Sequence, residues 1–409
     1  MVNNMVEKFC GIDVHKDTLV ATILDGQSEE KQTKKFHNTL PDIENLKQWL
    51  TQTQCQTAVM ESTGIFWVAL YLTLEEAKFR VMLANAYRVK GIAGRKTDQS
   101  DSEWLAYLLR AKLIKPSYVP TKQLRDLRLL TRLRTKYTQN KTQYKNRCQA
   151  ILSRVNIPIS TKISDVFGKA GSELLEGLMA GKSVVNILDT TQNKWLIAHR
   201  EEILEVAMGT LSATDVFMLE QLTDMIAHLN TQIAKVEMRI ERLLVEADLR
   251  IISSVPGVGK TTAASILAEL GDVSRFENAK QVSAWAGLAP SVYQSAGVTI
   301  LGHITKHGSR WLRRSLVEAA HAAVKVKNSV FRRMYFRIAE RRGKKTAVVA
   351  VARKLLTIIW HLLVCGELYV EEGFSKKPLK LRSNGLGGLS LDGMVEVLRK
   401  AGYTVSSEG

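Results

Sequence analysis

The stretch FCGIDVHKDTLVATIL, residues 9–24, decides the fold of the N-terminal part of the chain. Two apolar runs flank a polar turn at His15, Lys16 and Asp17, which predicts strand, tight turn and strand over residues 6–24. Further along, the pattern predicts a strand at 33–37, a helix at 41–53 with Pro41 near its first position, a buried strand at 57–61, a helix ending near Ala77 and a strand at 79–83. Three antiparallel strands followed by alternating helices and strands predict an α/β domain with a mixed sheet.

Four carboxylates occupy the ends of these predicted elements. Asp13 and Glu61 each close an apolar run, while Asp98 and Asp101 lie three residues apart at the start of a helical pattern and therefore share one helix face. Carboxylates on strand ends and one helix face are suited to holding two divalent cations against a phosphodiester. A lone Asp-x-x-Asp is more often a solvated helix start. The combination predicts a joint metal site for phosphoryl transfer on nucleic acid.

The chain carries a large positive charge. Its 58 Lys and Arg against 40 Asp and Glu give a net charge of +18 and an isoelectric point near 9.7. Residues 121–155 hold ten Lys or Arg and one acid, and residues 301–360 hold fifteen against two acids. Solvated helix faces are the ordinary explanation for charge runs, but two segments this unbalanced favour a polyanionic partner.

Cysteine usage and hydropathy give little sign of metal clusters or membranes. Cys10, Cys55, Cys148 and Cys365 lie far apart, without metal-ligand or disulfide spacing. The most apolar helical stretch, 347–365, contains Arg353, Lys354 and His361, so we predict a core helix rather than a membrane span. With no signal peptide, a reducing cytoplasm is the expected location.

The middle of the chain is predicted to be long and helical. An unbroken 3,4 spacing indicates a coiled coil, through Leu219, Leu222, Ile226, Leu229, Ile233, Val236, Ile240 and Leu243. An earlier helix at 121–155 has a second seam in which Arg134 and Lys141 interrupt the apolar residues. We expect these two helices to pair, in a hairpin or between chains. Residues 156–212 predict short helices and loops, and residues from Leu249 to Glu371 predict a compact helical domain.

Residues 256–262, Pro-Gly-Val-Gly-Lys-Thr-Thr, have two possible interpretations. A P-loop needs a glycine at the position of Ser254 and a preceding buried strand, and neither is evident. A helix-hairpin-helix, with Gly257-Val258-Gly259 as the hairpin, fits better and would present backbone N–H groups to a DNA phosphate. If the segment is a P-loop, Lys260 should be essential for ATP binding.

Two serine-containing stretches follow. Ser291 and Ser295 lie in a Gly/Ala-rich loop, where a serine is most often a turn residue. Ser309 is placed to cap a helix carrying Arg310, Arg313 and Arg314, a possible phosphate clamp. A serine beside such a clamp is a candidate for attack on phosphorus.

These motifs together resemble the DEDD transposases of bacterial insertion sequences, the IS110 family. The resemblance rests on Gly11-Ile12-Asp13-Val14-His15-Lys16, Glu61-Ser62-Thr63-Gly64, Lys96-Thr97-Asp98-Gln99-Ser100-Asp101, Ser254 to Gly259, Gly287-Leu288-Ala289-Pro290, and Ser295 with Ile304 to Gly308. It implies a RuvC-like (RNase H fold) catalytic domain at 1–118, a coiled-coil and connecting region at 119–249, and a C-terminal helical transposase domain with a helix-hairpin-helix at 250–371. A peripheral tail, 372–409, follows.

The resemblance also implies a mechanism and partners. Asp13, Glu61, Asp98 and Asp101 would bind Mg²⁺, with Mn²⁺ as an alternative. Ser295 would form a covalent phosphoserine link to DNA, with Ser291 as the fallback because many relatives carry Ser-Gly where this chain has Ser295-Ala296-Gly297. The expected partners are donor and target DNA, a structured guide (bridge) RNA, and further subunits in a dimer or tetramer that completes the active site. The cations expected to contact nucleic acid are Arg125, Arg128, Arg132, Arg134, Lys141, Lys260, Lys306, Arg310, Arg313 and Arg314.

Two rival functions are consistent with the same residues. A metal-dependent, RuvC-like junction nuclease would use the carboxylates and water, leaving Ser295 structural. A coiled-coil nucleic-acid scaffold would use neither. Ser295→Ala separates the first rival from strand exchange, and Asp13→Asn or Asp101→Asn separates the second.

Overall fold

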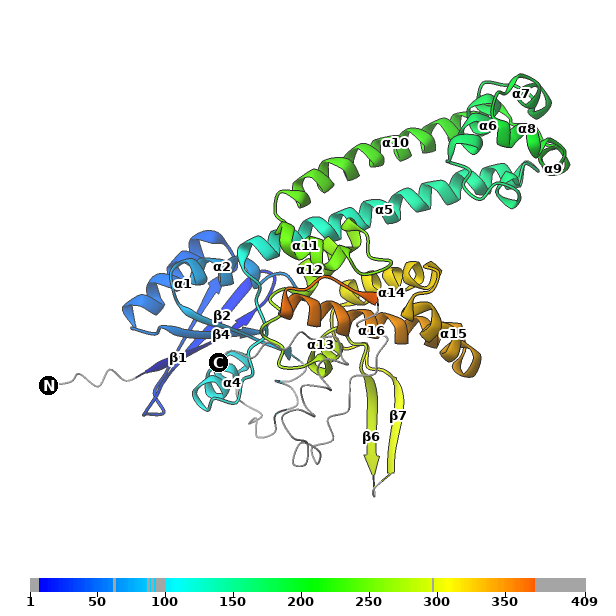
Figure 1. Cartoon of the computed structure of the whole chain (residues 1–409). Coiled ribbons are helices and arrows are strands. Elements are labelled where there is room, and N and C mark those ends of the chain that lie inside the picture. The colour runs from blue at the N-terminus through cyan, green and yellow to red at the C-terminus, as the bar shows by residue number, and fades with distance from the viewer. Residues whose placement is uncertain are drawn as a thin grey trace, which may run out of the picture. The chain divides into compact units, whose positions relative to one another are not determined.

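The computed structural model describes residues 7–61, 64–86, 89, 92, 100–295 and 298–371 (Figure 1). Its contacts divide the chain into two units, Met1–Thr121 and Lys122–Gly409. The division falls close to the predicted boundary at residue 118. The predicted tail lies outside the described residues, and the finer division into domains stays a prediction.

Unit 1 is built on a five-stranded mixed sheet in the order β3-β2-β1-β4-β5. The strands are β1 (Lys8–Val14), β2 (Thr18–Asp25), β3 (Lys31–His37), β4 (Thr57–Glu61) and β5 (Arg80–Ala84). β2 is antiparallel to β1 and β3, whereas β4 runs parallel to β1 and β5 parallel to β4. This confirms the predicted mixed α/β sheet, and its strand order is compatible with the RuvC-like, RNase H fold that the resemblance implies.

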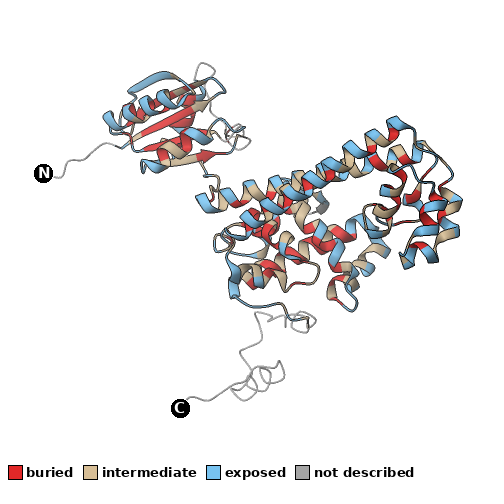
Figure 2. Cartoon of the chain, turned by 90° about the horizontal axis from the view of Figure 1, so that it is seen from above, coloured by how far each residue is buried: buried red, intermediate tan, exposed pale blue. Residues whose placement is uncertain are grey.

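Helices cover both faces of this sheet, because successive strand residues point to opposite sides. On one face Cys10, Ile12 and Met60 pack with α1 (Leu40–Gln52) and α2 (Val68–Glu76). On the other face Phe9 and Val59 pack with α4 (Asp101–Arg110). The central strands β1, β2 and β4 are largely buried, while the edge strand β3 and the outer sides of the helices are exposed (Figure 2). Residues 13 and 61 share the alternation of 9 and 59, so both belong to the α4 face.

Unit 2 begins with two long paired helices, α5 (Lys122–Arg154) and α10 (Ala213–Glu241) (Figure 1). The predicted apolar repeat of α10 is buried at Leu219, Ile226, Leu229, Ile233, Val236 and Ile240. The basic residues that interrupt the apolar seam of α5 form hydrogen bonds with side chains of α10. Arg134 Nε donates to Glu237 Oε1 at 2.8 Å, and Lys141 Nζ donates to Asn230 Oδ1 at 3.0 Å. The two helices therefore pair within one chain, as a hairpin.

The segment between these helices has a core of its own. Five short elements follow α5: η1 (Ile159–Thr161), α6 (Lys169–Met179), α7 (Val184–Thr190), α8 (Lys194–Ala198) and α9 (Arg200–Val206). Buried side chains such as Ile163, Leu174 and Ile203 pack with Leu152 of α5 and Leu219 of α10. The sequence predicted the short helices but not this common core.

The rest of unit 2 is a compact helical core. It comprises α11 (Glu246–Ser253), α12 (Lys260–Leu270), α13 (Ala279–Trp285), α14 (Arg310–Lys325), α15 (Val330–Arg342) and α16 (Lys344–Cys365). A helix, not a strand, precedes Pro256, so the segment is helix, turn and helix rather than a P-loop. Its identity as a DNA-binding helix-hairpin-helix stays a prediction.

Helix α16 is long and apolar enough to cross a membrane by length and composition alone, with a mean hydropathy of 1.9. Val351, Leu355 and Ile359, however, are fully buried in the core of unit 2. The packing agrees with the predicted core helix.

A β-hairpin interrupts this helical core, and the sequence did not predict it. Strands β6 (Pro290–Ser295) and β7 (Val298–Ile304) pair antiparallel and extend away from the helices (Figure 1). The predicted all-helical C-terminal domain is wrong here. The alternation in Val292, Tyr293 and Gln294 is too short, and those residues too exposed, to give a period-two apolar signal.

Candidate functional site

Three carboxylates lie on the α4 face of the sheet, near enough that Glu61 and Asp101 raise the pKa of Asp13. The parallel register pairs Ile12 with Met60, so the next residues, Asp13 and Glu61, are neighbours at the carboxyl ends of β1 and β4. Asp101 is the first residue of α4, which packs on the same face. The predicted fourth member, Asp98, lies outside the described residues. The structure thus brings together Asp13, Glu61 and Asp101.

The lack of a side chain at Gly11 allows α4 to pack closely against β1. A Cβ atom at residue 11 would lie 2.0 Å from the carbonyl oxygen of Ser102 and 2.4 Å from the amide nitrogen of Ala106. The buried hydroxyl of Ser102 in turn hydrogen-bonds to that of Thr22, in β2, at 2.8 Å. Ser100 caps the helix by accepting from the amide of Glu103. The start of α4 is therefore fixed against β1 and β2.

The surroundings of Asp13 favour the protonated form of its carboxyl group. Burial is the main cause that raises the pKa of Asp13, and the negative charges of Asp101 and Glu61 raise it further. His15 opposes this, because its Nε2 lies 3.0 Å from Asp13 Oδ2. Three carboxylates offer only oxygen ligands, which is the donor set that Mg²⁺ and Mn²⁺ prefer. The residues present fit a divalent cation.

Two residues beside this cluster were not among the predicted site residues. His15 was treated as part of a turn, although its place two residues after Asp13 was a signal that the two side chains are near. Asn38 Nδ2 donates to the carbonyl of His15 at 2.9 Å and to that of Phe66 at 3.2 Å. Asn38 thereby ties the loop after β1 to the loop after β4. No sequence spacing indicates this contact.

The predicted nucleophile lies in the β6–β7 hairpin. Ser295 is the last residue of β6 and pairs with Val298 across the turn. Ser291, the fallback, lies near the foot of the hairpin, where its hydroxyl donates to the carbonyl of His303 at 3.1 Å. Residues 296 and 297 lie outside the described residues.

The glycine-containing motifs of the sequence form the foot of this hairpin. Gly287 and Gly308 have φ angles of 65° and 140°, and a Cβ at Gly308 would lie 2.2 Å from the carbonyl oxygen of Trp285. The amide of Thr305 donates to Ala289 and that of Lys306 to the carbonyl of Gly287. These hydrogen bonds join the motif at 287–290 to the motif at 304–308, and they fix the point at which the hairpin leaves the helical core.

Several cations predicted to contact nucleic acid have partners within unit 2. Arg132 makes a two-pronged ion pair with the buried carboxylate of Glu269, at 2.7 and 3.0 Å. Arg128 donates to the carbonyls of Ala268 and Glu269 at 2.6 and 2.9 Å. Together with the interhelical bonds of Arg134 and Lys141, these contacts hold α5 against α10 and α12.

The predicted phosphate clamp on α14 is also engaged internally. Ser309 caps the helix as predicted, accepting from Leu312 N at 3.1 Å, and donates its own hydroxyl to Glu269 at 2.8 Å. Arg313 donates to the carbonyl of Ala286 at 3.0 Å, and burial lowers its pKa. Arg314 pairs with Glu318 at 2.8 Å. The side chain of Arg310 lies over the ring of Trp311 at 5.3 Å.

The remaining predicted cations occupy helices and one loop. Lys260 is exposed at the start of α12, Arg125 lies in the first turns of α5, and Lys306 follows β7.

A basic groove opens at the foot of the hairpin. It has a volume of about 1040 Å³ and lies between β6, β7, α15 and α16. Among the described residues that line it there are five Lys or Arg and no carboxylate: Lys306, Arg342, Lys345, Arg353 and Lys354. Leu288, Ile304, Met334 and Val349 supply apolar walls. The sequence indicated the basic segment 301–360 but, apart from Lys306, not the residues that form this groove.

Two transposase family models match parts of this chain. Residues 10–157 match a family model for DEDD transposases of the IS110 type, described as "Transposase", and residues 249–336 match the model "Transposase IS116/IS110/IS902 family". The chain belongs to the IS110 family of transposases. The first match contains the carboxylates, and the second contains the hairpin with Ser295 and most of α15.

Individual relatives of this IS110-family chain match it over different lengths. It is 38% identical over 125 residues to the transposase for insertion sequence element IS1111A of Coxiella burnetii, covering 30% of this chain and 34% of that one. It is 27% identical over 277 residues to a probable family 20 transposase of Pseudomonas aeruginosa, covering 66% and 73%. It is 30% identical over 159 residues to the pilin gene-inverting protein of Moraxella lacunata, covering 37% and 49%. The matches thus span from about a third to about three quarters of these relatives.

Proposed function

We propose that this chain is an RNA-guided DNA recombinase that cleaves and exchanges strands through a covalent phosphoserine intermediate. The observation that carries the proposal is the placement of Asp13, Glu61 and Asp101 on one face of the sheet, where the charges of Asp101 and Glu61 raise the pKa of Asp13. The presence of this cluster in an IS110-family chain supports phosphoryl transfer on DNA over a purely structural role.

Asp13, Glu61, Asp98 and Asp101 would hold the divalent cations, Mg²⁺ or Mn²⁺. Bound there, the cations would supply charge neutralisation at the scissile phosphate and a lower pKa for the attacking hydroxyl. His15 and Asn38 orient the cluster. His15 contacts Asp13 directly, and Asn38 joins the loops that follow the two strands carrying Asp13 and Glu61.

Ser295 performs the attack in this proposal. Its oxygen forms a bond to phosphorus, the bond to one strand end breaks, and that end leaves as a hydroxyl carrying the serine's proton. The hydroxyl of a second strand then attacks the phosphoserine ester, and the serine regains its proton. The phosphodiester is exchanged without hydrolysis. Ser291, whose hydroxyl donates to the carbonyl of His303, stays the fallback.

The basic groove is the proposed path for a nucleic-acid backbone near the hairpin. Its five cations are exposed or half-buried and line a concave surface next to β6 and β7. Backbone contacts hold a nucleic acid in place without reading its bases, so base pairing with a guide RNA would supply sequence choice. The reaction would take place on the cell's own DNA, in the cytoplasm.

The proposal includes subunits that complete each other's site. The carboxylates lie in unit 1 and Ser295 in a hairpin of unit 2 that extends from its helical core. An extended strand pair is a suitable element for reaching a neighbouring protomer, which supports a dimer or tetramer.

The decisive experiment is trapping of the covalent adduct. Purified chain, guide RNA and DNA are incubated with Mg²⁺ and denatured, and the protein–DNA adduct is detected on a gel. Ser295→Ala should abolish the adduct and retain RNA binding. Ser291→Ala, in the same hairpin, is the matched control and should retain the adduct. If metal-dependent cleavage persists in Ser295→Ala, the junction nuclease is the correct function.

A second variant tests the scaffold alternative. Asp101→Asn removes one charge from an exposed position at the start of α4, so the fold should be retained. Loss of recombination with retained nucleic-acid binding supports the proposal. Unchanged recombination products in this variant would favour the scaffold.

A further inference from the structure

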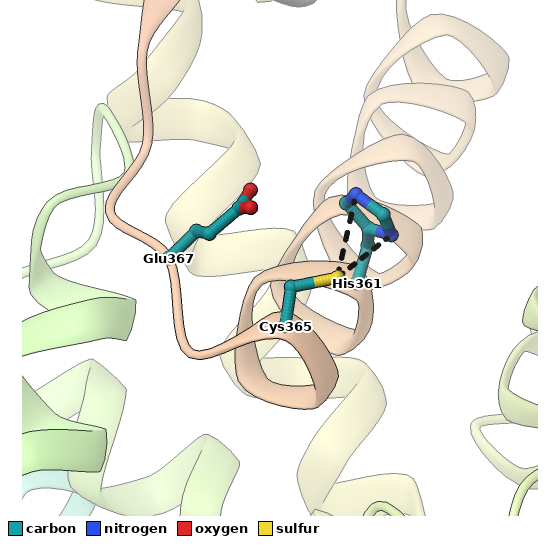
Figure 3. A group of neighbouring side chains, drawn as sticks. All are labelled: His361, Cys365 and Glu367. Carbon is teal, nitrogen blue, oxygen red and sulfur yellow. Dashed lines mark hydrogen bonds between the residues drawn. The ribbon is translucent and has the colours of Figure 1, made fainter. Parts of the chain in front are cut away.

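The end of α16 carries a second group of metal-ligating side chains, far along the chain from the carboxylates. His361, Cys365 and Glu367 are all exposed, and their ligand atoms lie within 4.8 Å of one another. Figure 3 shows the thiol of Cys365 turned towards the imidazole of His361, with the side chain of Glu367 on the neighbouring turn of chain. The sulfur lies 3.8 Å from Nδ1 and 3.9 Å from Nε2.

The backbone that presents these three side chains is fixed. His361 and Cys365 are four residues apart and so share one face of α16. Gly366 ends the helix in the left-handed conformation, with φ 72°, and the amide of Glu367 donates to the carbonyl of Leu362 at 3.0 Å. Two residues later the amide of Tyr369 is bonded to the hydroxyl of Ser254 at 2.8 Å. The helix end and the chain that returns over it are therefore both anchored to the core.

The donor set and its spacing match zinc rather than magnesium. Thiolate, imidazole and carboxylate are the three ligand types that zinc accepts, whereas Mg²⁺ selects oxygen. Zinc bonds of about 2.3 Å to sulfur and about 2.0 Å to nitrogen place the two atoms about 3.5 Å apart at a tetrahedral angle. The observed sulfur–nitrogen distances of 3.8 and 3.9 Å are only slightly longer, and a carboxylate oxygen of Glu367 lies within 4.8 Å of both ligand atoms.

Two features of the position of these residues at the end of α16 favour the binding of a metal ion. A helix C-terminus carries partial negative charge, which attracts a cation. Cys365 is exposed, while Cys10, Cys55 and Cys148 are buried, so it is the thiol open to a metal ion from solvent. A thiolate and a carboxylate together balance the charge of one divalent ion.

We propose that His361, Cys365 and Glu367 form a zinc site that fixes the end of α16, with water in the fourth position. The site is independent of the recombination chemistry proposed above, and its ligands are all in unit 2. Zinc bound to the folded chain and not to the unfolded chain stabilises the fold by mass action.

Co²⁺ titration of the full-length chain tests this directly, because a cobalt–thiolate bond gives a near-ultraviolet charge-transfer band that oxygen ligands do not give. The titration is run in excess Mg²⁺, which occupies the carboxylates of unit 1. We expect one equivalent of Co²⁺ to produce the band together with the visible absorption of a tetrahedral ion. Added Zn²⁺ should abolish both, and Zn²⁺ should slow alkylation of Cys365 by iodoacetamide.

Matched variants separate this site from adventitious binding. Cys365→Ser should lose the charge-transfer band, and His361→Ala and Glu367→Gln should each weaken Zn²⁺ binding by at least about tenfold. His321→Ala and Glu340→Gln remove the same groups from exposed positions on α14 and α15 and should bind as the wild type does. If the wild type gives no band, or if the band survives in Cys365→Ser, the proposal is wrong.

Discussion

Asp13 binds its proton more tightly in the folded chain than in the unfolded chain. Its pKa is raised above the ordinary 3.8, so the folded state holds its proton more tightly than the unfolded chain does. Stability contributed by that proton is present at low pH and is lost as pH rises from the unfolded value through the raised folded one. Mg²⁺ needs the ionised form, so its affinity should rise with pH over the same range.

Asp13→Asn should remove both the pH dependence of stability and the Mg²⁺ binding that depend on the Asp13 carboxyl group. We expect the metal-free variant to melt at the same temperature as the wild type or slightly higher at pH 7, because one repelling charge is gone. The rise in melting temperature caused by Mg²⁺ should disappear. Glu76→Gln, an exposed position on α2, is the control and should keep the Mg²⁺ response. A full Mg²⁺ response in Asp13→Asn would exclude this residue as a ligand.

Gly11 has a steric role that can be measured separately. Gly11→Ala should destabilise unit 1 by about 1–3 kcal/mol, because the new methyl group overlaps the backbone of α4. Hydrogen exchange of the α4 amides should become faster. Gly259→Ala is the control, since nothing lies within 4 Å of a Cβ at that position. Unchanged exchange in α4 after Gly11→Ala would contradict the close contact.

At the scale of secondary-structure elements, Arg132 joins α5 to α12. Arg132→Met leaves Glu269, which is 3% exposed, without its ion-pair partner and should cost about 3 kcal/mol of stability. Arg239→Met, on the exposed face of α10, should cost little. Thermal unfolding of both variants measures the difference. If Arg132→Met melts normally but binds DNA poorly, the residue is mainly a nucleic-acid contact, as the sequence analysis expected.

The groove beside the hairpin should account for part of the salt dependence of binding. Lys345→Glu with Arg353→Glu should weaken DNA binding and lower the slope of log affinity against log salt by about two, one for each phosphate contact. Lys235→Glu with Arg239→Glu makes the same charge change on exposed positions of α10. Equal losses in both double variants would mean that net charge, not the groove, determines binding.

For the whole molecule, the division into two units makes complementation informative. Asp13→Asn chains and Ser295→Ala chains should each be inactive in strand exchange. If one subunit supplies carboxylates and another supplies the serine, mixed oligomers contain some intact sites and should recover activity. Each variant alone, at the same total concentration, is the control. No recovery in mixed oligomers would place both groups of an active site in the same subunit.

Much of this fold follows from local sequence patterns. The strand starting at Thr57, the helix at Pro41 and the repeat in α10 were predicted because apolar periodicity and turn residues act over a few positions. The β6–β7 hairpin was missed because its strands are short and exposed. The common core of α6 to α9 was missed because it depends on contacts between distant residues.

In the candidate site, too, local sequence patterns predicted some features, whereas contacts between distant residues were not predicted. Three of the four predicted carboxylates lie on one face of the sheet, since parallel strands bring their ends to one edge, and their joint role stays a prediction. Charge counts indicated basic segments but gave no way to see that Arg132 faces Glu269 or that Arg353 faces the groove. The cluster of His361, Cys365 and Glu367 was not predicted because the spacing between cysteines gives no sign of a histidine one helical turn away.

The length of the paired helices α5 and α10 also determines how far the short helices α6 to α9 lie from the rest of unit 2. Since an α-helix rises 1.5 Å per residue, the 29 residues of α10 span about 44 Å, more than the roughly 34 Å of one turn of duplex DNA. The small bundle of α6 to α9 is therefore carried at the end of a spacer of defined reach. Removing seven residues from each helix, opposite one another, would shorten the spacer by about 10 Å and keep the same faces in contact.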